Sequence, residues 1–215
     1  MYIPFTYPFI IRTNLKYEKT LLDVGSGNGR FMTEINWDKK FKVIGVELFD
    51  VYIKQAKATK LYEKILKKDI MELAFEKNSF DAVLASQIVE HFTKQEGILL
   101  IKKMERWAGN TVIIGTPNGH FHQEEWEGNK LQAHKSSWQV EDYKKLGYKV
   151  YGQGFKLVYG RNGFLSSSLA NIRILSLIMF FFSYLLSPFV YFFPRHAAYL
   201  IAIKKLRNEK QYRMI

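Results

Sequence analysis

The stretch that decides the fold is LLDVGSGNGRF, from Leu21 to Phe31. Its apolar start predicts the end of a buried parallel strand, and glycines at positions 25, 27 and 29 then turn the chain into a helix that begins near Asn28. Only glycine lets backbone approach a ligand this closely. A helix N-terminus at a strand tip carries unpaired N–H groups and favours an anionic or polar group. The stretch therefore predicts a ligand-binding turn, with a tight turn that binds nothing as the alternative.

The glycine spacing separates this turn from a dinucleotide-binding one. The pattern G-x-G-x-x-G needs its third glycine three residues after the second, whereas these glycines alternate and follow Asp23. The stretch resembles motif I of the class I S-adenosylmethionine-dependent methyltransferases. In that family the glycine loop lies against the methionine part of the cofactor, and the preceding acidic residue helps to hold the amino group. The resemblance implies S-adenosyl-L-methionine as cofactor and assigns five residues to it: Asp23, Gly25, Ser26, Gly27 and Gly29.

Length and composition indicate one α/β unit. With 215 residues the chain makes a single domain, 1–215, that can bury a core without disulfides. The absence of cysteine excludes disulfides, thiolate metal sites and a catalytic thiol. A net charge of +12 favours an anionic partner such as nucleic acid, a phosphorylated substrate or an acidic membrane, although lysines scattered over a solvated surface account for it equally well.

The N-terminal arm, residues 1–18, is aromatic and apolar, with prolines at positions 4 and 8. These prolines predict an extended or irregular segment rather than a long helix, and we expect it to cover the mouth of the ligand site. The arm lacks the basic start and the small-residue cleavage site of a signal peptide, so we expect it to be retained and the protein to be cytoplasmic.

Two further strands place carboxylates at their tips. The β-branched run 41–47 ends on Glu47, where a carboxylate can accept both ribose hydroxyls of an adenosine; a surface glutamate is the alternative. A crossover helix is predicted over 50–60 and a third strand over 64–70. Asp69 matches the acidic residue that receives the adenine amino group in the family, with a capping role as the alternative. The neighbouring residues Leu48 and Ile70 are assigned to the same site.

The fourth strand and its exit, FDAVLASQIVEHF over 80–92, resemble motif IV of the same family. There the end of the strand borders both cofactor and methyl acceptor. The resemblance implies that Ser86 and Gln87 line the cofactor and that Glu90 and His91 face the acceptor. A hydrogen-bonding residue at a helix start is the alternative role of His91.

The remaining pattern completes the predicted fold. A helix over 94–109, a strand over 110–119, a short helix over 139–146 and strands over 147–160 and 197–206 alternate along the chain, and a polar loop over 118–137 holds three of the five histidines. The loop motifs TPNGH and HKSSW and the EHF exit resemble small, mostly uncharacterised bacterial and archaeal members of the superfamily. The fold class implied is α/β: a Rossmann-like, doubly wound, seven-stranded sheet with an antiparallel seventh strand.

A hydrophobic helical insertion, 164–195, separates strands six and seven and contains 21 consecutive residues without a charge. A single membrane crossing conflicts with the return of the seventh strand to the sheet, and Pro188 divides the run. We expect residues 169–194 to lie peripherally at the inner face of a membrane, beside a basic tail formed by Lys204, Lys205, Arg207, Lys210 and Arg213. A packed cap or a homodimer face is the alternative.

Methyl transfer to oxygen requires alignment and a base, and His91 is the best candidate base. The catalytic prediction comprises His91, Glu90 and His134, which should converge although their loops are distant in sequence. The acceptor predicted is a small or lipid-linked molecule, and no metal ligand is assigned.

Two other functions stay open. Small-RNA 2′-O-methyltransferases carry an acidic residue, then Glu-His, and a distant DHKxxW-like histidine that together bind a divalent metal. Glu90, His91 and His134 match three of these four positions, and Gln87 replaces the first acidic ligand. RNA, contacted through the positive charge, is therefore the alternative substrate. A non-catalytic cofactor-binding or membrane-scaffold protein is the other alternative.

Overall fold

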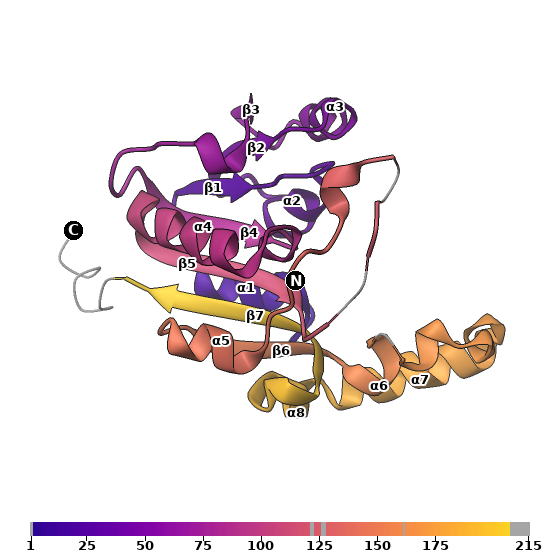
Figure 1. Cartoon of the computed structure of the whole chain (residues 1–215). Coiled ribbons are helices and arrows are strands. Elements are labelled where there is room, and N and C mark those ends of the chain that lie inside the picture. The colour runs from indigo at the N-terminus through magenta and orange to yellow at the C-terminus, as the bar shows by residue number, and fades with distance from the viewer. Residues whose placement is uncertain (1, 121–122, 126–127, 161, 207–215) are drawn as a thin grey trace.

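The computed structural model describes residues 2–120, 123–125, 128–160 and 162–206. They form a seven-stranded sheet in the order β3-β2-β1-β4-β5-β7-β6 (Figure 1). All strands run parallel except β7, which pairs antiparallel with both β5 and β6. The strands are β1 Thr20–Val24, β2 Lys42–Glu47, β3 Lys64–Lys67, β4 Phe80–Ser86, β5 Ala108–Pro117, β6 Lys149–Phe155 and β7 Ala197–Lys205. The predicted fold class is confirmed.

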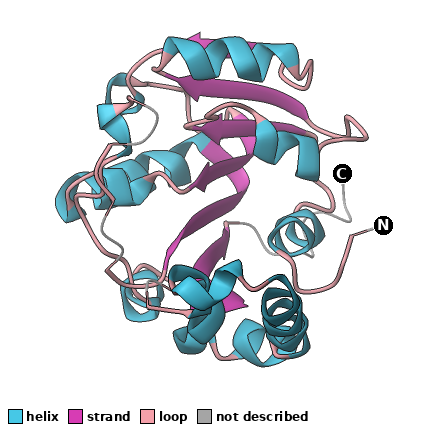
Figure 2. Ribbon diagram, turned by 90° about the vertical axis from the view of Figure 1, so that its right-hand side faces the viewer, coloured by secondary structure: helices cyan, strands magenta, loops and turns pink. Residues whose placement is uncertain are grey.

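Helices cover both faces of the twisted sheet (Figure 2). The α-helices are α1 Tyr7–Asn14, α2 Arg30–Ile35, α3 Asp50–Ala58, α4 Lys94–Trp107, α5 Val140–Lys145, α6 Lys156–Tyr159, α7 Arg173–Leu185 and α8 Ser187–Phe192. Short 3-10 turns are η1 Ile70–Glu72, η2 Val89–His91, η3 Lys130–Gln132, η4 Phe164–Ser166, η5 Ser168–Asn171 and η6 Pro194–His196.

Alternation along the central strands divides the core in two. In β1, Leu21 points to a cluster with α1 and α2, whereas Leu22 points to a cluster with α4 and α5. This period of two is what a strand buried on both faces requires. Because both faces are covered, the open edge at the carboxyl ends of the parallel strands is left for a ligand.

The N-terminal arm differs from the prediction. Residues 7–14 form α1, and Ile10, Ile11 and Leu15 are fully buried against the sheet. Pro8 stands in the first turn of this helix, where its missing N–H removes no helical hydrogen bond. The prolines therefore shorten the helix without preventing it, and burial of its apolar stripe stabilises it.

The hydrophobic insertion folds as two helices divided at the predicted place. Helix α7 ends at Leu185, and α8 begins at Ser187 with Pro188 in its first turn. The 13 residues of α7 extend about 20 Å, less than the ~30 Å hydrocarbon core. Among the described residues no helix has both the length and the apolar character to cross a bilayer.

The turn between β1 and α2 depends on its glycines. Gly27 and Gly29 have φ values of 53° and 78°, in the left-handed region that L side chains avoid. A Cβ on Gly29 would lie 2.9 Å from the Cα of Ala56 in α3, whereas a Cβ on Gly27 would meet nothing within 4 Å. Gly29 therefore allows helix packing, while Gly27 leaves open space beside the turn.

This difference predicts unequal stability losses. Gly27→Ala should lower the free energy of unfolding by about 1–2 kcal/mol, the cost of a left-handed alanine. Gly29→Ala should lower it by about 2–5 kcal/mol, because steric overlap with α3 adds to the same backbone cost. Urea unfolding of both variants measures the two losses, and equal losses would contradict the close approach of α3.

Candidate functional site: a crevice at the carboxyl edge

The glycine turn is held against β2 by the carboxylate of Glu47. Its Oε2 accepts from the backbone N–H of Gly27 at 2.9 Å, and its Oε1 accepts from Leu48 and Phe49 at 2.8 and 2.9 Å. The side chain is 8% exposed. Hydrogen bonds to a carboxylate are stronger than neutral ones, so Glu47 joins the turn after β1 to the loop after β2.

The predicted carboxylate Asp23 lies below the turn and is not solvent-exposed. It is 4% exposed and accepts from the Tyr62 hydroxyl at 2.7 Å. Burial raises the pKa of the Asp23 carboxyl to about 7, the Tyr62 bond opposes this rise, and the charge of Glu47 adds to it. Tyr62 was not predicted, because only the fold brings the segment before β3 under the glycine turn.

Two adjacent hollows, together called the crevice, open beside these residues. The larger has a volume of about 410 Å³ and is lined by the glycine turn, Glu47, Ser86 and Gln87. The smaller, of about 140 Å³, is lined by Leu48, Asp69, Ile70 and His91. Gly25, Glu47, Ile88 and Gln132 border both. All the predicted cofactor residues except Gly29 thus line one crevice, and Gly29 supports it from behind.

Asp69 makes the capping contact that was its alternative role, and it also lines the crevice. Its carboxylate caps the η1 turn by accepting from the Met71 N–H at 2.7 Å. The residue also lines the smaller hollow together with Ile70. Because one carboxylate has several lone pairs, capping leaves acceptor capacity toward the crevice.

The loop after β5 supplies a wall that the sequence did not reveal. Residues 129–132, which include η3, line the smaller hollow, and Gln132 reaches both. Residues 121–122 and 126–127 of this loop lie outside the described part of the chain. Polar loops carry no periodicity, so their contacts are invisible before folding.

The N-terminal arm also reaches the site. The Tyr7 hydroxyl and the Ser86 hydroxyl lie 3.0 Å apart, and the Tyr7 ring packs edge-on against Phe31. A Cβ on Gly115 of β5 would overlap the Tyr7 hydroxyl at 1.5 Å. The absence of a side chain at Gly115 therefore leaves the space that the Tyr7 hydroxyl occupies at the end of β4. Gln87, the next residue after β4, has a left-handed φ of 58°.

Glu90, His91 and His134 converge as the sheet topology predicts. One ligand atom from each lies within 4.8 Å of the other two, and the two imidazole rings have centroids 5.0 Å apart. The backbone carbonyl of Glu90 holds the distant loop by accepting from Lys135 and Ser136 at 2.8 and 3.1 Å. The fully buried Trp138 donates its indole N–H to the Ser136 hydroxyl and so fixes the C-terminal end of this loop.

His91 is oriented as a proton acceptor. Its Nδ1 lies 3.3 Å from the carbonyl oxygen of Ala133, which can only accept, so the proton is assigned to Nδ1 and Nε2 keeps a lone pair. Burial, and then the neighbouring His134, lower the pKa of His91 below its ordinary value. The imidazole is therefore neutral near pH 7.

The Glu90 carboxyl is buried, and no hydrogen bond to its oxygens offsets the cost of removing it from water. Both carboxylate oxygens lack a hydrogen-bond partner at 2% exposure, and burial raises the pKa of this group to about 8. An unpaired buried carboxyl is costly, and its position beside two imidazoles makes Glu90 a candidate functional residue. Beyond His134 lies a further hollow of about 570 Å³, here called the outer hollow, lined by Lys94, His120, Lys135 and Ser137 among others.

Comparisons with known proteins agree with this architecture. Residues 22–109 match the family model of a methyltransferase domain. An uncharacterised protein of Methanocaldococcus jannaschii is 26% identical over 157 residues, covering 73% of this chain and 64% of that protein. A sterol 24-C-methyltransferase of Candida albicans is 28% identical over 157 residues, covering 70% of this chain and 38% of that enzyme. The chain thus matches less than two thirds of each relative.

Two solved structures share the fold over most of their length. A SAM-dependent methyltransferase from Archaeoglobus fulgidus has a TM-score of 0.56 at 18% identity, covering 92% of this chain and 94% of that chain. The methyltransferase domain of bacterial CtHen1 has a TM-score of 0.57 at 15% identity, covering 95% and 98%. Likeness at this identity shows the fold alone.

The raised pKa of Asp23 predicts a pH-dependent stability. Between pH 4 and 7 the folded protein holds a proton that the unfolded chain has released, so stability falls as pH rises, by up to ~1.4 kcal/mol per unit for this group. Asp23→Asn cannot titrate and should show a flatter decline in urea unfolding across this range. Parallel pH profiles for the two proteins would contradict the burial of a proton on Asp23.

Proposed function

Because the chain belongs to the class I S-adenosylmethionine-dependent methyltransferases, we propose that it transfers the methyl group of this cofactor to an oxygen of a small or lipid-linked molecule. The observation that carries the proposal is the juxtaposition of the crevice with a neutral, oriented imidazole. His91 lines the crevice and lies beside His134, which opens onto the outer hollow. In this proposal the crevice holds the methyl donor and the outer hollow holds the acceptor, and the residues that follow β4 lie between them.

The space and the polar groups of the crevice are consistent with binding of S-adenosylmethionine. Open space beside Gly27 and an unpartnered buried hydroxyl on Ser26 leave room and polar capacity at the turn. In the proposal the glycine turn receives the methionine part, and Asp23 beneath it supports the amino group. Glu47 accepts from the ribose hydroxyls, with Leu48 beside it. Asp69 and Ile70 border the adenine, and Ser86 and Gln87 close the crevice at the end of β4.

The bound cofactor supplies an electrophilic methyl group on a sulfonium. The residues of the chain need to hold the acceptor oxygen in line and to remove its proton. Nε2 of His91 takes this proton, and the Nδ1–H···O=C bond to Ala133 keeps the ring in position. The resulting imidazolium lies beside the Glu90 carboxyl, whose oxygens have no other hydrogen-bond partner and can stabilise the positive charge.

The acceptor class follows from what surrounds the base. The outer hollow is lined by polar side chains, among them two lysines, two histidines and Asp142, which pairs with Lys94 at 2.8 Å. This lining suits a polar group on the acceptor. The sterol 24-C-methyltransferase among the relatives supports a lipid acceptor, although its name specifies transfer to carbon and this chain matches 38% of that enzyme. The presence of both the glycine turn and Glu47 argues against a non-catalytic scaffold.

Cofactor binding should depend on Glu47. Glu47→Ala removes a charged acceptor at the ribose position and should weaken binding more than ~10-fold, equal to ~1.4 kcal/mol. Calorimetric titration with S-adenosylmethionine measures this change, and thermal unfolding checks that the variant is folded. Glu63→Ala, which removes an exposed carboxylate before β3, is the matched control. Equal affinity in the Glu47 variant and the control would exclude the ribose role.

Turnover should depend on His91. His91→Ala should lower methyl transfer by ~100-fold or more and leave cofactor affinity nearly unchanged, because the ring acts on the acceptor proton. Labelled cofactor, incubated with lipid, glycan and RNA fractions of the source cell, identifies the acceptor class and measures the rate. His196→Ala, an exposed histidine in η6, is the control and should retain activity. Full activity without His91 would overturn its role as base.

RNA 2′-O-methylation with a divalent metal is the second candidate, and one observation favours it. Glu90, His91 and His134 offer a carboxylate and two imidazoles within 4.8 Å, and both Glu90 oxygens are otherwise unpartnered. This donor set fits a metal such as Mn²⁺ or Zn²⁺, which would polarise a ribose hydroxyl. Gln87 stands where a fourth, acidic ligand would complete the set. If the labelled methyl group appears mainly in RNA, and if a chelator abolishes this labelling, RNA 2′-O-methylation replaces the small-acceptor proposal.

A further inference from the structure

Exposed apolar side chains concentrate on one part of the molecule. Of the 22 large hydrophobic residues that the described chain exposes, fifteen lie between Leu157 and Phe193. We call the segment 164–193 the arm, which is distinct from the N-terminal arm of residues 1–18. Such contiguous apolar surface is uncommon on a monomer and marks a binding surface.

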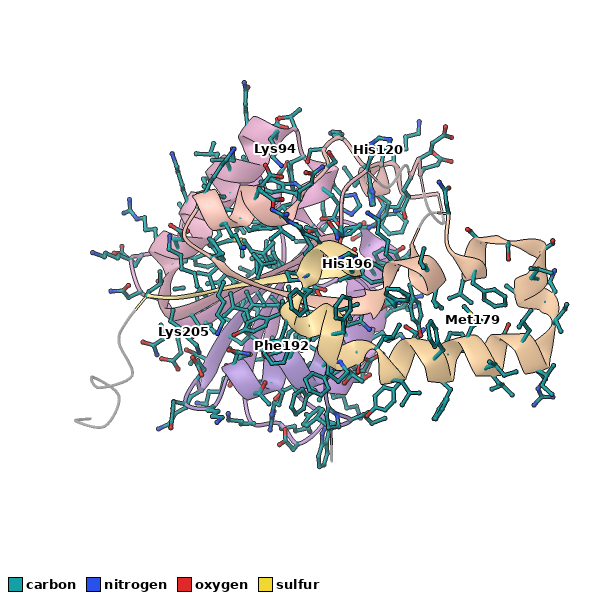
Figure 3. All side chains as sticks on the ribbon, turned by 90° about the horizontal axis from the view of Figure 1, so that it is seen from below. Lys94, His120, Met179, Phe192, His196 and Lys205 are labelled. Carbon is teal, nitrogen blue, oxygen red and sulfur yellow. The ribbon has the colours of Figure 1, made fainter. Side chains whose placement is uncertain are left out.

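Helix α7 presents five strongly exposed apolar side chains as a stripe. Its five most exposed large residues, at 56–70%, recur at helical spacing: Ile174, Leu177, Ile178, Phe181 and Leu185. Ser183 is the one buried residue of the helix, and its hydroxyl accepts from the Phe155 N–H, tying the C-terminal end of α7 to β6. From this attachment the rest of α7 projects away from the sheet, as the position of Met179 shows (Figure 3).

The sequence around the arm contains no acidic residue. Between Asp142 and Glu209 there are ten lysines and arginines and neither aspartate nor glutamate. Arg173 at the start of α7 and Lys156 at the start of α6 are exposed. An apolar surface flanked by the exposed cations Lys156 and Arg173 complements an anionic lipid surface, because the side chains enter the acyl boundary while the cations meet the headgroups. Two copies of the arm would instead bring like charges together.

The cations that flank the arm differ from those the sequence suggested. Lys204 and Lys205 pair with Glu105 and Glu18 at 3.0 and 3.5 Å. They lie at the far end of β7, and Figure 3 places the labelled Lys205 and Met179 on opposite sides of the molecule. Residues 207, 210 and 213 lie outside the described part of the chain. The described end of the basic tail therefore does not lie beside the arm.

The arm starts at the same sheet edge as the crevice. Strand β6 runs parallel to β5, so its end at Phe155 and the beginning of β7 at Ala197 lie at the carboxyl edge. The side-chain amide of Asn118, which follows β5, donates to carbonyls of Pro194, Arg195 and Ala197. The loop after β5, which carries His134 and is called the acceptor loop below, is thereby joined to the base of the arm.

We propose that the arm docks on an anionic bilayer, with the α7 stripe inserted at headgroup depth and Arg173 among the phosphates. Docking at this edge places the acceptor loop at the lipid surface. Binding needs no methyl transfer, so a failure of docking and a failure of the proposed function are distinguishable.

Vesicle flotation of the full chain without cofactor tests the proposal. The protein should float with vesicles of phosphatidylcholine and phosphatidylglycerol and much less with phosphatidylcholine alone, and salt should weaken binding only partly because apolar burial persists. The double variant Leu177→Glu/Phe181→Glu should lose at least ~10-fold in bound fraction, since both side chains lie on the exposed stripe. Leu99→Glu, on α4 with 50% exposure, is the matched control and should float like the unmodified protein.

Other outcomes overturn the proposal. A protein that stays at the bottom with both vesicle types does not dock on lipid. If sedimentation then shows a dimer that the double variant converts to a monomer, a second copy of the chain covers the arm. Equal loss of flotation in the Leu99 control would show that the stripe is not the docking surface.

Discussion

The carboxylate of Glu47, with its three backbone N–H donors, is the interaction on which the candidate site depends. It joins Gly27, in the turn after β1, to the first two residues after β2. A buried carboxylate is costly unless it is hydrogen-bonded, and the two loop ends supply the donors. Both walls of the crevice are therefore set by one side chain. Packing of Gly29 on α3 then orients the helix that follows the turn.

The second constraint is the attachment of the loop after β5 to the exit of β4. The Glu90 carbonyl holds residues 135 and 136, and this places His134 against His91. Neither histidine has a continuous helix or strand to position it, so backbone hydrogen bonds and the buried Trp138 do so instead. The Glu90 carboxyl is left buried and unpartnered between them. The proposed proton transfer and the alternative metal site both require this convergence of one carboxyl and two imidazoles.

The arm and the crevice share one sheet edge because of strand direction. With β6 parallel to β5, the insertion that follows β6 starts where the ligand-binding loops end. Asn118 connects the two parts through three carbonyls. The base of the arm therefore lies at the same sheet edge as the crevice.

The antiparallel direction of the seventh strand was implied by the resemblance to the methyltransferase family. Local pattern determined three other features before folding: the strand–turn–helix with its glycines, the carboxylate at the tip of β2 and the division of the apolar run at Pro188. These features depend on neighbouring residues and on strand order, which a sequence carries directly. Tertiary structure alone decided the rest. Packing folds part of the N-terminal arm, residues 1–18, into α1 and brings the Tyr7 hydroxyl to Ser86. It also places Tyr62 on Asp23 and Gln132 at the crevice. Lys204 and Lys205 pair with Glu105 and Glu18, away from the segment 164–193. The physical reason is that these contacts join segments far apart in the chain through irregular loops, whose residues have no periodicity to reveal their partners.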